Sequence, residues 1–230
     1  MNQMHQMNQM DQMNQMNQKL NQMKKRKQLK MAVQVLFAVL FFVLLTTDNL
    51  RPWRLIFIAG ILLAPLLGRV YCGWICPIHT GSMLVTVHKK KSGRKPIPVP
   101  AMFKAPWIRY AMAVLFLAAV ILGERVLDRQ IPVLLIFFVL GLVLTYFYQE
   151  AFIHRFLCPY GAILKLAAFR SKRAVAVNPE RCQGNGDCEK ACPTGAVHLT
   201  DGKASIESSE CLVCLRCVMN CKEKAIAYRH

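Results

Sequence analysis

Seven of the ten cysteines lie between residues 181 and 221, and their spacing is that of metal thiolates. The second half of this stretch reads C-x2-C-x2-C-x3-C and comprises Cys211, Cys214, Cys217 and Cys221. This is the run that surrounds a [4Fe–4S] cluster in bacterial ferredoxins. Such close spacing favours metal binding over the disulfides of a secreted protein. Because thiolate ligands need a reducing environment, it also indicates a reducing compartment.

The first half of the stretch is a copy of this run with one cysteine missing. Asn185 stands where the second cysteine belongs, and the three cysteines present are Cys182, Cys188 and Cys192. In a two-cluster ferredoxin the fourth cysteine of each run ligates the other cluster. One [4Fe–4S] cluster is therefore expected on Cys192, Cys211, Cys214 and Cys217.

The second cluster would have three thiolates, from Cys182, Cys188 and Cys221. Three thiolates suit a [3Fe–4S] cluster, or a [4Fe–4S] cluster whose labile iron is held by water, and loss of the cluster is the third alternative. Because the other three ligands are in place, we favour a three-thiolate cluster.

The remaining three cysteines occur in two motifs that end in Cys-Pro. The motif from Cys72 to Pro77 reads C-x3-C-P, and the motif from His154 to Pro159 reads H-x3-C-P. Residues i and i+4 share one face of a helix, so each motif is expected to present a pair of ligands on one face. Each motif follows a pair of apolar segments, which indicates an internal duplication.

The side chains of these motifs leave three interpretations open. Three thiolates and one imidazole suit a metal ion or a cluster, and two thiols suit a redox pair. In the third interpretation they are only small residues at helix ends near the membrane surface and have no chemical role. We favour a redox or quinone-linked role, with the catalytic candidates Cys72, Cys76, His154 and Cys158. Lesser candidates for binding a quinone head group or moving its protons are Arg69, His79 and His88.

Four apolar segments upstream of the cysteine-rich stretch determine where the two motifs lie. They are residues 31–47, 55–67, 107–122 and 131–148. The first would be about 26 Å long as a helix at 1.5 Å per residue, which is enough for the hydrocarbon core of a bilayer. Each segment is therefore predicted to be a transmembrane helix, and the Cys-Pro motifs follow the second and the fourth.

The formal charge of +18 lies entirely in the apolar part of the chain. From Asn178 onward seven Lys/Arg balance seven Asp/Glu, whereas the preceding residues hold 23 Lys/Arg and five Asp/Glu. The expected partner is an anionic lipid bilayer and not nucleic acid, because no aromatic-basic motif accompanies the charge.

With a cytoplasmic N-terminus, the inside segments would hold 19 Lys/Arg and the outside turns four. The positive-inside rule thus predicts a multi-pass protein of the cytoplasmic membrane, with both termini and the cluster domain in the cytoplasm.

The N-terminal segment has low complexity, with methionine at every third position from Met1 to Met16 and mostly Asn-Gln between. Such a composition cannot build a core, so disorder is expected. Thioethers and His5 suit Cu(I), but we favour an expanded triplet repeat that binds nothing.

The predicted organisation is a disordered basic tail over residues 1–30, a transmembrane domain of four helices over 31–173, and a ferredoxin-like domain over 174–230. The fold class is an α-helical membrane protein followed by a small α+β two-cluster domain.

Over residues 31–230 the chain resembles the NapH/MauN-type membrane ferredoxins, which include NosH, and it shares C-x3-C-P motifs with the larger NosR and CcoG proteins. The likeness rests on Y-C-G-W-I-C-P after the second span, C-P-Y-G after the fourth, and the two-cluster C-terminus. It places the family's paired motifs on Cys72, Cys76 and Cys158. His154 and Asn185 each replace a family cysteine.

This resemblance implies oxidation of menaquinol or ubiquinol, in anaerobic respiration, for a periplasmic reductase of the nitrate or nitrous oxide type. Electrons would pass through the iron–sulfur clusters and through partner iron–sulfur or cytochrome subunits. One alternative is reduction of copper on the cytoplasmic side, of the CcoG kind. Another is a membrane anchor for a different redox subunit, with clusters that are largely structural.

Overall fold

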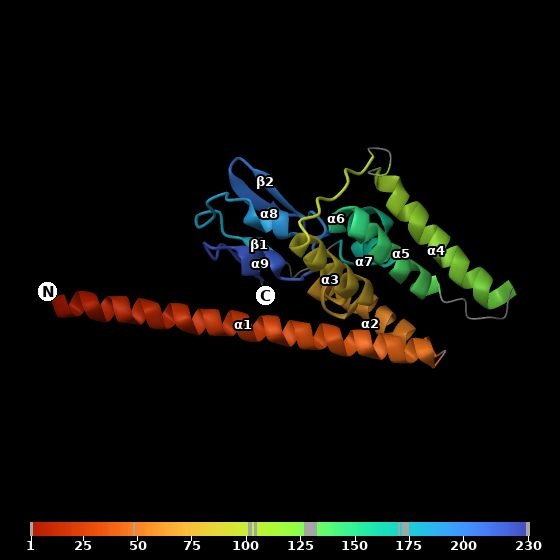
Figure 1. Cartoon of the computed structure of the whole chain (residues 1–230), viewed down its shortest axis with the longest axis horizontal. Helices are drawn as coiled ribbons and strands as arrows, with labels where there is room; N and C mark the ends of the chain where they lie inside the picture. The colour runs from red at the N-terminus through yellow and green to blue at the C-terminus, as the bar shows by residue number, and fades with distance from the viewer. Residues whose placement is uncertain are drawn as a thin grey trace.

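A computed structural model gives the structure of the chain and describes residues 2–47, 49–100, 103, 105–126, 133–169, 171 and 175–228. The first part is helical and the last part is a small α+β domain (Figure 1). The helical part consists of α1 (Asn2–Thr46), α2 (Arg51–Leu67), η1 (Tyr71–Ile75), α3 (Pro77–Lys91), α4 (Pro106–Val126), α5 (Val133–Phe147), α6 (Glu150–Phe152), η3 (Ile153–Leu157) and α7 (Pro159–Ala167). The α+β domain consists of β1 (Val175–Val177), α8 (Asp187–Ala191), β2 (Val197–Thr200), β3 (Lys203–Ile206), α9 (Arg216–Asn220) and β4 (Ile226–Tyr228).

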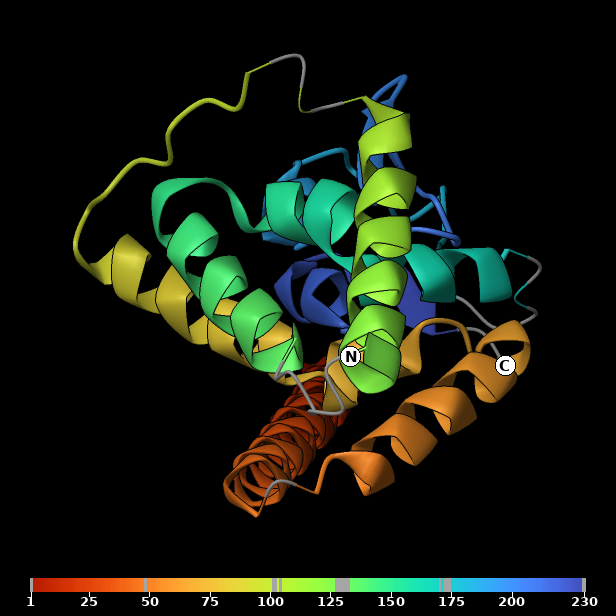
Figure 2. The ribbon, with the colours of Figure 1, turned by 90° about the vertical axis from the view of Figure 1, so that its right-hand side faces the viewer.

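All four predicted spans overlap helices in the described part of the chain, residues 131 and 132 lying outside it, but the helices differ in length. By length and composition, Lys24–Thr46 and Pro106–Gly123 could each cross a membrane. The apolar stretch Leu135–Phe147 is shorter, and α2 has 17 residues. Aromatic side chains join three of these helices, since the ring of Phe41 lies 5.2 Å from that of Trp53 and 6.0 Å from that of Phe138. Viewed nearly along α1, α3 and α5 pack side by side, and α4 stands beside them, in front of the segment from η3 to α7 (Figure 2).

Where disorder was expected for residues 1–30, the structure has helix over residues 2–30. Residues 2–30 form the first part of α1, which continues without a break into the apolar segment. The N-terminal half of α1 extends beyond the rest of the molecule (Figure 1). The physical reason is that Met and Gln are good helix formers, and a helix already nucleated in the apolar segment propagates at little cost. The copper interpretation concerns the side chains of His5 and the N-terminal methionines, which the structure does not describe.

The α+β domain contains two small antiparallel sheets. In one, β1 pairs with β4, with Val175 opposite Tyr228, so the start and the end of the domain lie side by side. In the other, β2 pairs with β3 in a hairpin whose turn uses left-handed backbone at Asp201 and Gly202. The short helices α8 and α9 pack against each other, and the cysteine runs lie in and beside them. This is the two-fold repeated arrangement expected for the C-terminal domain.

A buried carboxylate joins the α+β domain to the helices. Glu210 is 1% exposed, and its carboxylate accepts a bidentate pair of hydrogen bonds from Arg109 at 2.6 and 3.0 Å. Lys165 Nζ lies 2.5 Å and Arg69 Nη1 lies 3.4 Å from the same carboxylate. Burial would raise the pKa of Glu210, but the hydrogen bonds from Arg109 and Lys165 lower it below its ordinary 4.5. The site next to Glu210, at Cys211, is thereby fixed against the helical part.

Candidate functional site

The two Cys-Pro motifs have the same backbone structure, which makes the internal duplication visible. Each begins with one π-helical turn, η1 or η3, closed by a hydrogen bond from the cysteine before proline to the residue five positions earlier. The N–O distances are 2.9 Å for Cys76 to Tyr71 and 2.8 Å for Cys158 to Ile153. The turn that carries each motif is therefore wider than the α-helical turn that we expected. A π-turn ends at the cysteine and a new helix starts at the proline, as is frequent at functional sites.

Proline explains why the second cysteine of each motif lies at a helix N-terminus. Pro77 and Pro159 are the first residues of α3 and α7, where a missing backbone N–H costs nothing. The free N–H groups of the first turn then point at the sulfur of Cys76 in one half and of Cys158 in the other. A helix N-terminus favours negative charge, so both positions suit a thiolate ligand.

The structure brings Cys72, Cys76 and Cys158 together at the start of α3 and α7. All three are buried and belong to one core cluster. Burial raises the pKa of each thiol, to about 11 for Cys158, and neighbouring thiols raise those of Cys76 and Cys158 further. As free thiols they would be protonated at neutral pH, whereas a thiol–disulfide pair works through a thiolate. A metal or a cluster bound to the three sulfurs would take the place of these protons.

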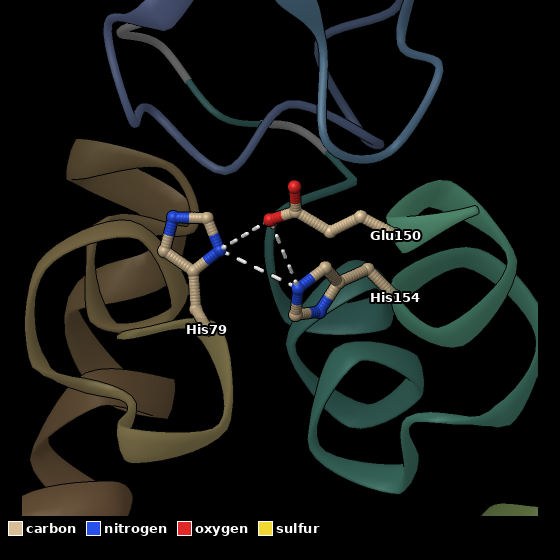
Figure 3. Close-up of side chains that lie close together, drawn as sticks. All are labelled: His79, Glu150 and His154. Carbon is tan, nitrogen blue, oxygen red and sulfur yellow. Dashed lines mark hydrogen bonds and ion pairs between the residues drawn. The ribbon is translucent and has the colours of Figure 1, made fainter. Parts of the chain in front are cut away.

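His154 occupies the position in the second motif that Cys72 occupies in the first, but its Nε2 atom lies near other partners. That atom is 3.4 Å from Nδ1 of His79 and 3.8 Å from a carboxylate oxygen of Glu150 (Figure 3). Burial lowers the pKa of His154 to about 4 and that of His79 well below 6.5, so both imidazoles are neutral. Sequence reasoning weighed His79 only as a lesser candidate and missed Glu150. His88, the third lesser candidate, is exposed at the end of α3.

The four cysteines predicted for the [4Fe–4S] cluster line one cavity. They are Cys192, Cys211, Cys214 and Cys217. Backbone N–H groups donate to two of the sulfurs, from Ala196 to Cys192 at 3.2 Å and from Val213 to Cys211 at 3.4 Å. Val213 has a left-handed φ of 53°, which a β-branched residue rarely adopts. The loop is thus bent around the sulfurs, and four thiols with N–H donors fit a cubane cluster.

The second set of cysteines lines a separate cavity together with Asn185. Its cysteines are Cys182, Cys188 and Cys221. Backbone N–H groups again donate to sulfur, from Ala204 to Cys182 at 3.4 Å and from Ala225 to Cys221 at 3.3 Å. The hydrogen bond from Ala204 lowers the pKa of Cys182, so this position also suits a thiolate. Asn185 lies on the wall of the cavity, where a fourth cysteine would be.

The cavity of the first cluster lies directly against the first Cys-Pro motif. A Cβ atom on Gly73 would be 2.3 Å from the carbonyl oxygen of Leu212 and 3.1 Å from Cα of Cys214. The next residue, Trp74, donates a hydrogen bond of 3.0 Å from its indole nitrogen to the carbonyl of Val213. Only glycine permits this approach of two backbones.

Two side chains of α1 also bind the backbone where the first Cys-Pro motif meets the loop of the first cluster cavity. Lys30 Nζ donates to the carbonyl of Cys214 at 2.8 Å, and Gln34 Nε2 donates to the carbonyl of Gly73 at 3.1 Å. Both side chains are buried, at 5% and 2% exposure. Their partners are backbone atoms far away in the sequence, so sequence reasoning had no signal for them.

Comparisons with known proteins match both cysteine-rich parts of the chain. A family described as a 4Fe-4S binding domain matches residues 52–95 and again residues 130–175, each containing one Cys-Pro motif. A family described as a 4Fe-4S dicluster domain matches residues 174–222. The double match supports the duplication seen in η1 and η3. No solved structure matches the chain.

Three relatives cover about seven tenths of the chain each. An uncharacterized protein of Methanocaldococcus jannaschii is 29% identical over 74% of this chain and 68% of its own length. The putative electron transport protein YccM of Escherichia coli is 26% identical over 73% of this chain and 52% of its own length. The ferredoxin-type protein NapH of Haemophilus influenzae is 26% identical over 70% of this chain and 62% of its own length.

These matches make the chain similar to ferredoxin-type proteins such as NapH, with the 4Fe-4S domains of both family models. This confirms the resemblance found in the sequence. As a NapH-like protein it is an iron–sulfur electron-transfer protein, and its long apolar helices together with its relatives indicate a membrane protein.

Proposed function

We propose that this NapH-like protein takes electrons from menaquinol or ubiquinol at the membrane surface and passes them to a periplasmic reductase of the nitrate or nitrous oxide type through partner subunits. Iron–sulfur clusters, when bound, supply the one-electron chemistry that links a two-electron quinol to single-electron carriers. The chain itself supplies thiols, buried polar groups and the path between them.

The observation that carries the proposal is the direct contact between the first Cys-Pro motif and the loop of the first cluster cavity. Gly73 lies between Cys72 and Trp74 and touches the backbone at Leu212 and Cys214. Cys72, Cys76, Cys158 and Cys214 belong to one buried cluster of side chains, and the remaining six cysteines to the next. The three groups of cysteines therefore form a continuous series, from the ends of the apolar helices to the outer cavity that Asn185 lines.

We place the cluster domain and both termini in the cytoplasm of a multi-pass topology, as the distribution of Lys and Arg predicts.

Anaerobic EPR of the purified protein in detergent tests this proposal. Spectra are recorded as isolated, after a menaquinol analogue, and after dithionite. Quinol is expected to reduce the clusters to a measurable fraction of the dithionite signal in the wild type. The same reduction should be lost in Cys76→Ser, which alters only the membrane-side group, while dithionite still reduces the clusters of the C-terminal domain.

Reduction by dithionite alone in the wild type would overturn the quinol proposal, because quinol would then not be the donor. Equal reduction by quinol in the wild type and in Cys76→Ser would show that electrons reach the C-terminal domain without the Cys-Pro motifs. The dithionite-reduced spectrum of each sample verifies that both proteins keep the clusters of the C-terminal domain.

A further inference from the structure

Three buried side chains from the two halves of the duplication meet at one point. His79 comes from α3, whereas Glu150 and His154 come from α6 and η3 (Figure 3). Their exposures are 1%, 7% and 4%. His79 Nδ1 lies 3.6 Å from Glu150 Oε1, His154 Nε2 lies 3.8 Å from the same oxygen, and the two nitrogens are 3.4 Å apart.

These separations suit ligands around an ion better than a cluster of short hydrogen bonds. Good N–H···O bonds have donor–acceptor distances near 2.9 Å, and all three distances are longer. A point equidistant from the three atoms lies about 2.1 Å from each of them. Zinc–nitrogen bonds are about 2.0–2.1 Å and zinc–carboxylate bonds about 2.0–2.2 Å long.

The carboxylate of Glu150 is oriented so that one oxygen is left for the centre of the group. Its Oε2 accepts hydrogen bonds from Arg216 at 2.8 Å and from Thr86 at 3.2 Å. Its Oε1, buried and aimed at the two imidazoles, has no hydrogen-bond partner among the described residues. A buried carboxylate oxygen without a partner is costly, and a cation between the three atoms would remove that cost. Metal-ligating carboxylates are commonly oriented by such outer hydrogen bonds.

The duplication shows that this group is not a repeated feature of the fold. Counting from each Cys-Pro pair, Glu150 corresponds to Gly68 and His154 to Cys72. His79 likewise corresponds to Gly161. A Cβ atom on Gly161 would be 2.9 Å from a guanidinium nitrogen of Arg69, so a side chain that reaches a ligand has no room there. The halves therefore differ at the three positions that build the group.

We propose that His79, Glu150 and His154 bind one divalent first-row transition ion of the Zn2+ or Fe2+ class, in a mononuclear site separate from the cysteine sites. Two imidazoles and one carboxylate are a recurrent ligand set for these ions, with further positions left for water or substrate. The site bridges the two halves of the helical part beside the Cys-Pro motifs. It goes beyond the electron-transfer function and does not depend on quinol being the donor.

Zinc binding to the intact holoprotein tests the proposal. Protein with its clusters is dialysed anaerobically against a chelator, then against Zn2+, and zinc and acid-labile sulfide are measured per chain. The wild type and the control variant His88→Gln, which changes the exposed histidine at the end of α3, should each take up one Zn2+. The variants Glu150→Gln and His79→Gln should bind it at least about 100-fold more weakly, with unchanged sulfide.

X-ray absorption at the zinc edge distinguishes this site from zinc bound to cysteine. The expected spectrum has nitrogen and oxygen neighbours at about 2.0–2.1 Å with imidazole scattering and no sulfur shell at about 2.3 Å. A wild type that takes up no Zn2+, a sulfur shell, or equal uptake by all four proteins would each overturn the proposal. The wild-type measurements decide even if a variant fails to fold.

Discussion

At the scale of single residues, Asn185 determines what the outer cluster cavity can hold. It lies on the wall of that cavity with three cysteines and stands where the repeat demands a fourth. Asn185→Cys should complete the ligand set, so that the site gains an iron and any three-iron EPR signal of the oxidised protein disappears. Iron, sulfide and EPR measured on the same sample test this. Asn185→Ser serves as the control, because serine is similar in size to cysteine but cannot supply a thiolate. It should leave the signal as in the wild type. A three-iron signal that persists in Asn185→Cys would contradict the assignment.

The cysteine groupings were predictable from the sequence, whereas the carboxylates beside them were not. Ligand spacing in the runs from Cys182 to Cys221 is local, and the exchange of fourth ligands follows from the repeat. The structure accordingly gathers the sets around Cys192 and Cys221 that the spacing predicts. Glu150 and Glu210 are single acidic residues whose partners lie up to 141 positions away, as in the bond from Arg69 to Glu210. No short pattern encodes such a pair.

At the scale of elements, the π-turns are the feature that sequence reasoning missed. A period of 3.6 describes the apolar segments well, and all four overlap helices. The motifs at Cys72 and His154 depart from that period because the chain widens to a π-turn before proline restarts the helix. Proline alone indicated a break, but it did not indicate that the turn before it was wider.

The attachment of the α+β domain to the helices depends on Glu210. Glu210→Gln removes the charge opposite three buried or partly buried cations and should cost about 3–5 kcal/mol of stability. The control Glu207→Gln removes a partly exposed pair with Arg155, 4.0 Å apart, and should cost no more than about 1 kcal/mol. Thermal unfolding of both variants in detergent measures the difference. Equal midpoints would show that Glu210 does not fasten the domain.

The same carboxylate predicts how the attachment depends on pH. Because the folded-state pKa of Glu210 is lowered, its contribution is fully present above the ordinary carboxyl pKa of 4.5 and is lost as the pH falls through the folded value. Wild type and Glu210→Gln should therefore differ most in stability at neutral pH and converge at acidic pH. A stability difference between the two proteins that grows as the pH falls below 4.5 would contradict this prediction.

At the scale of the whole molecule, the unequal distribution of charge predicts its orientation in the membrane. The domain after Asn178 has no net charge, and the +18 belongs to the segments that flank the apolar helices. The length of α1, which places residues 2–30 and the apolar segment in one helix, could not be predicted from composition, because a low-complexity segment has no core to reveal its structure.

Fusions to alkaline phosphatase, active only outside the cytoplasm, and to a green fluorescent protein, fluorescent inside it, test that orientation. Phosphatase activity is expected for a fusion after Thr47, at the end of α1, because the chain has then crossed the bilayer once. Fluorescence is expected for fusions after Pro100 and after His230, since the segment 77–100 is rich in Lys and the α+β domain packs against η1. Replacing Lys24, Lys25, Arg26 and Lys27 with Gln should weaken this preference by removing inside charge. Phosphatase activity of the His230 fusion in the otherwise unaltered chain would reverse the topology and place the cysteine cavities of residues 182–221 outside the cytoplasm.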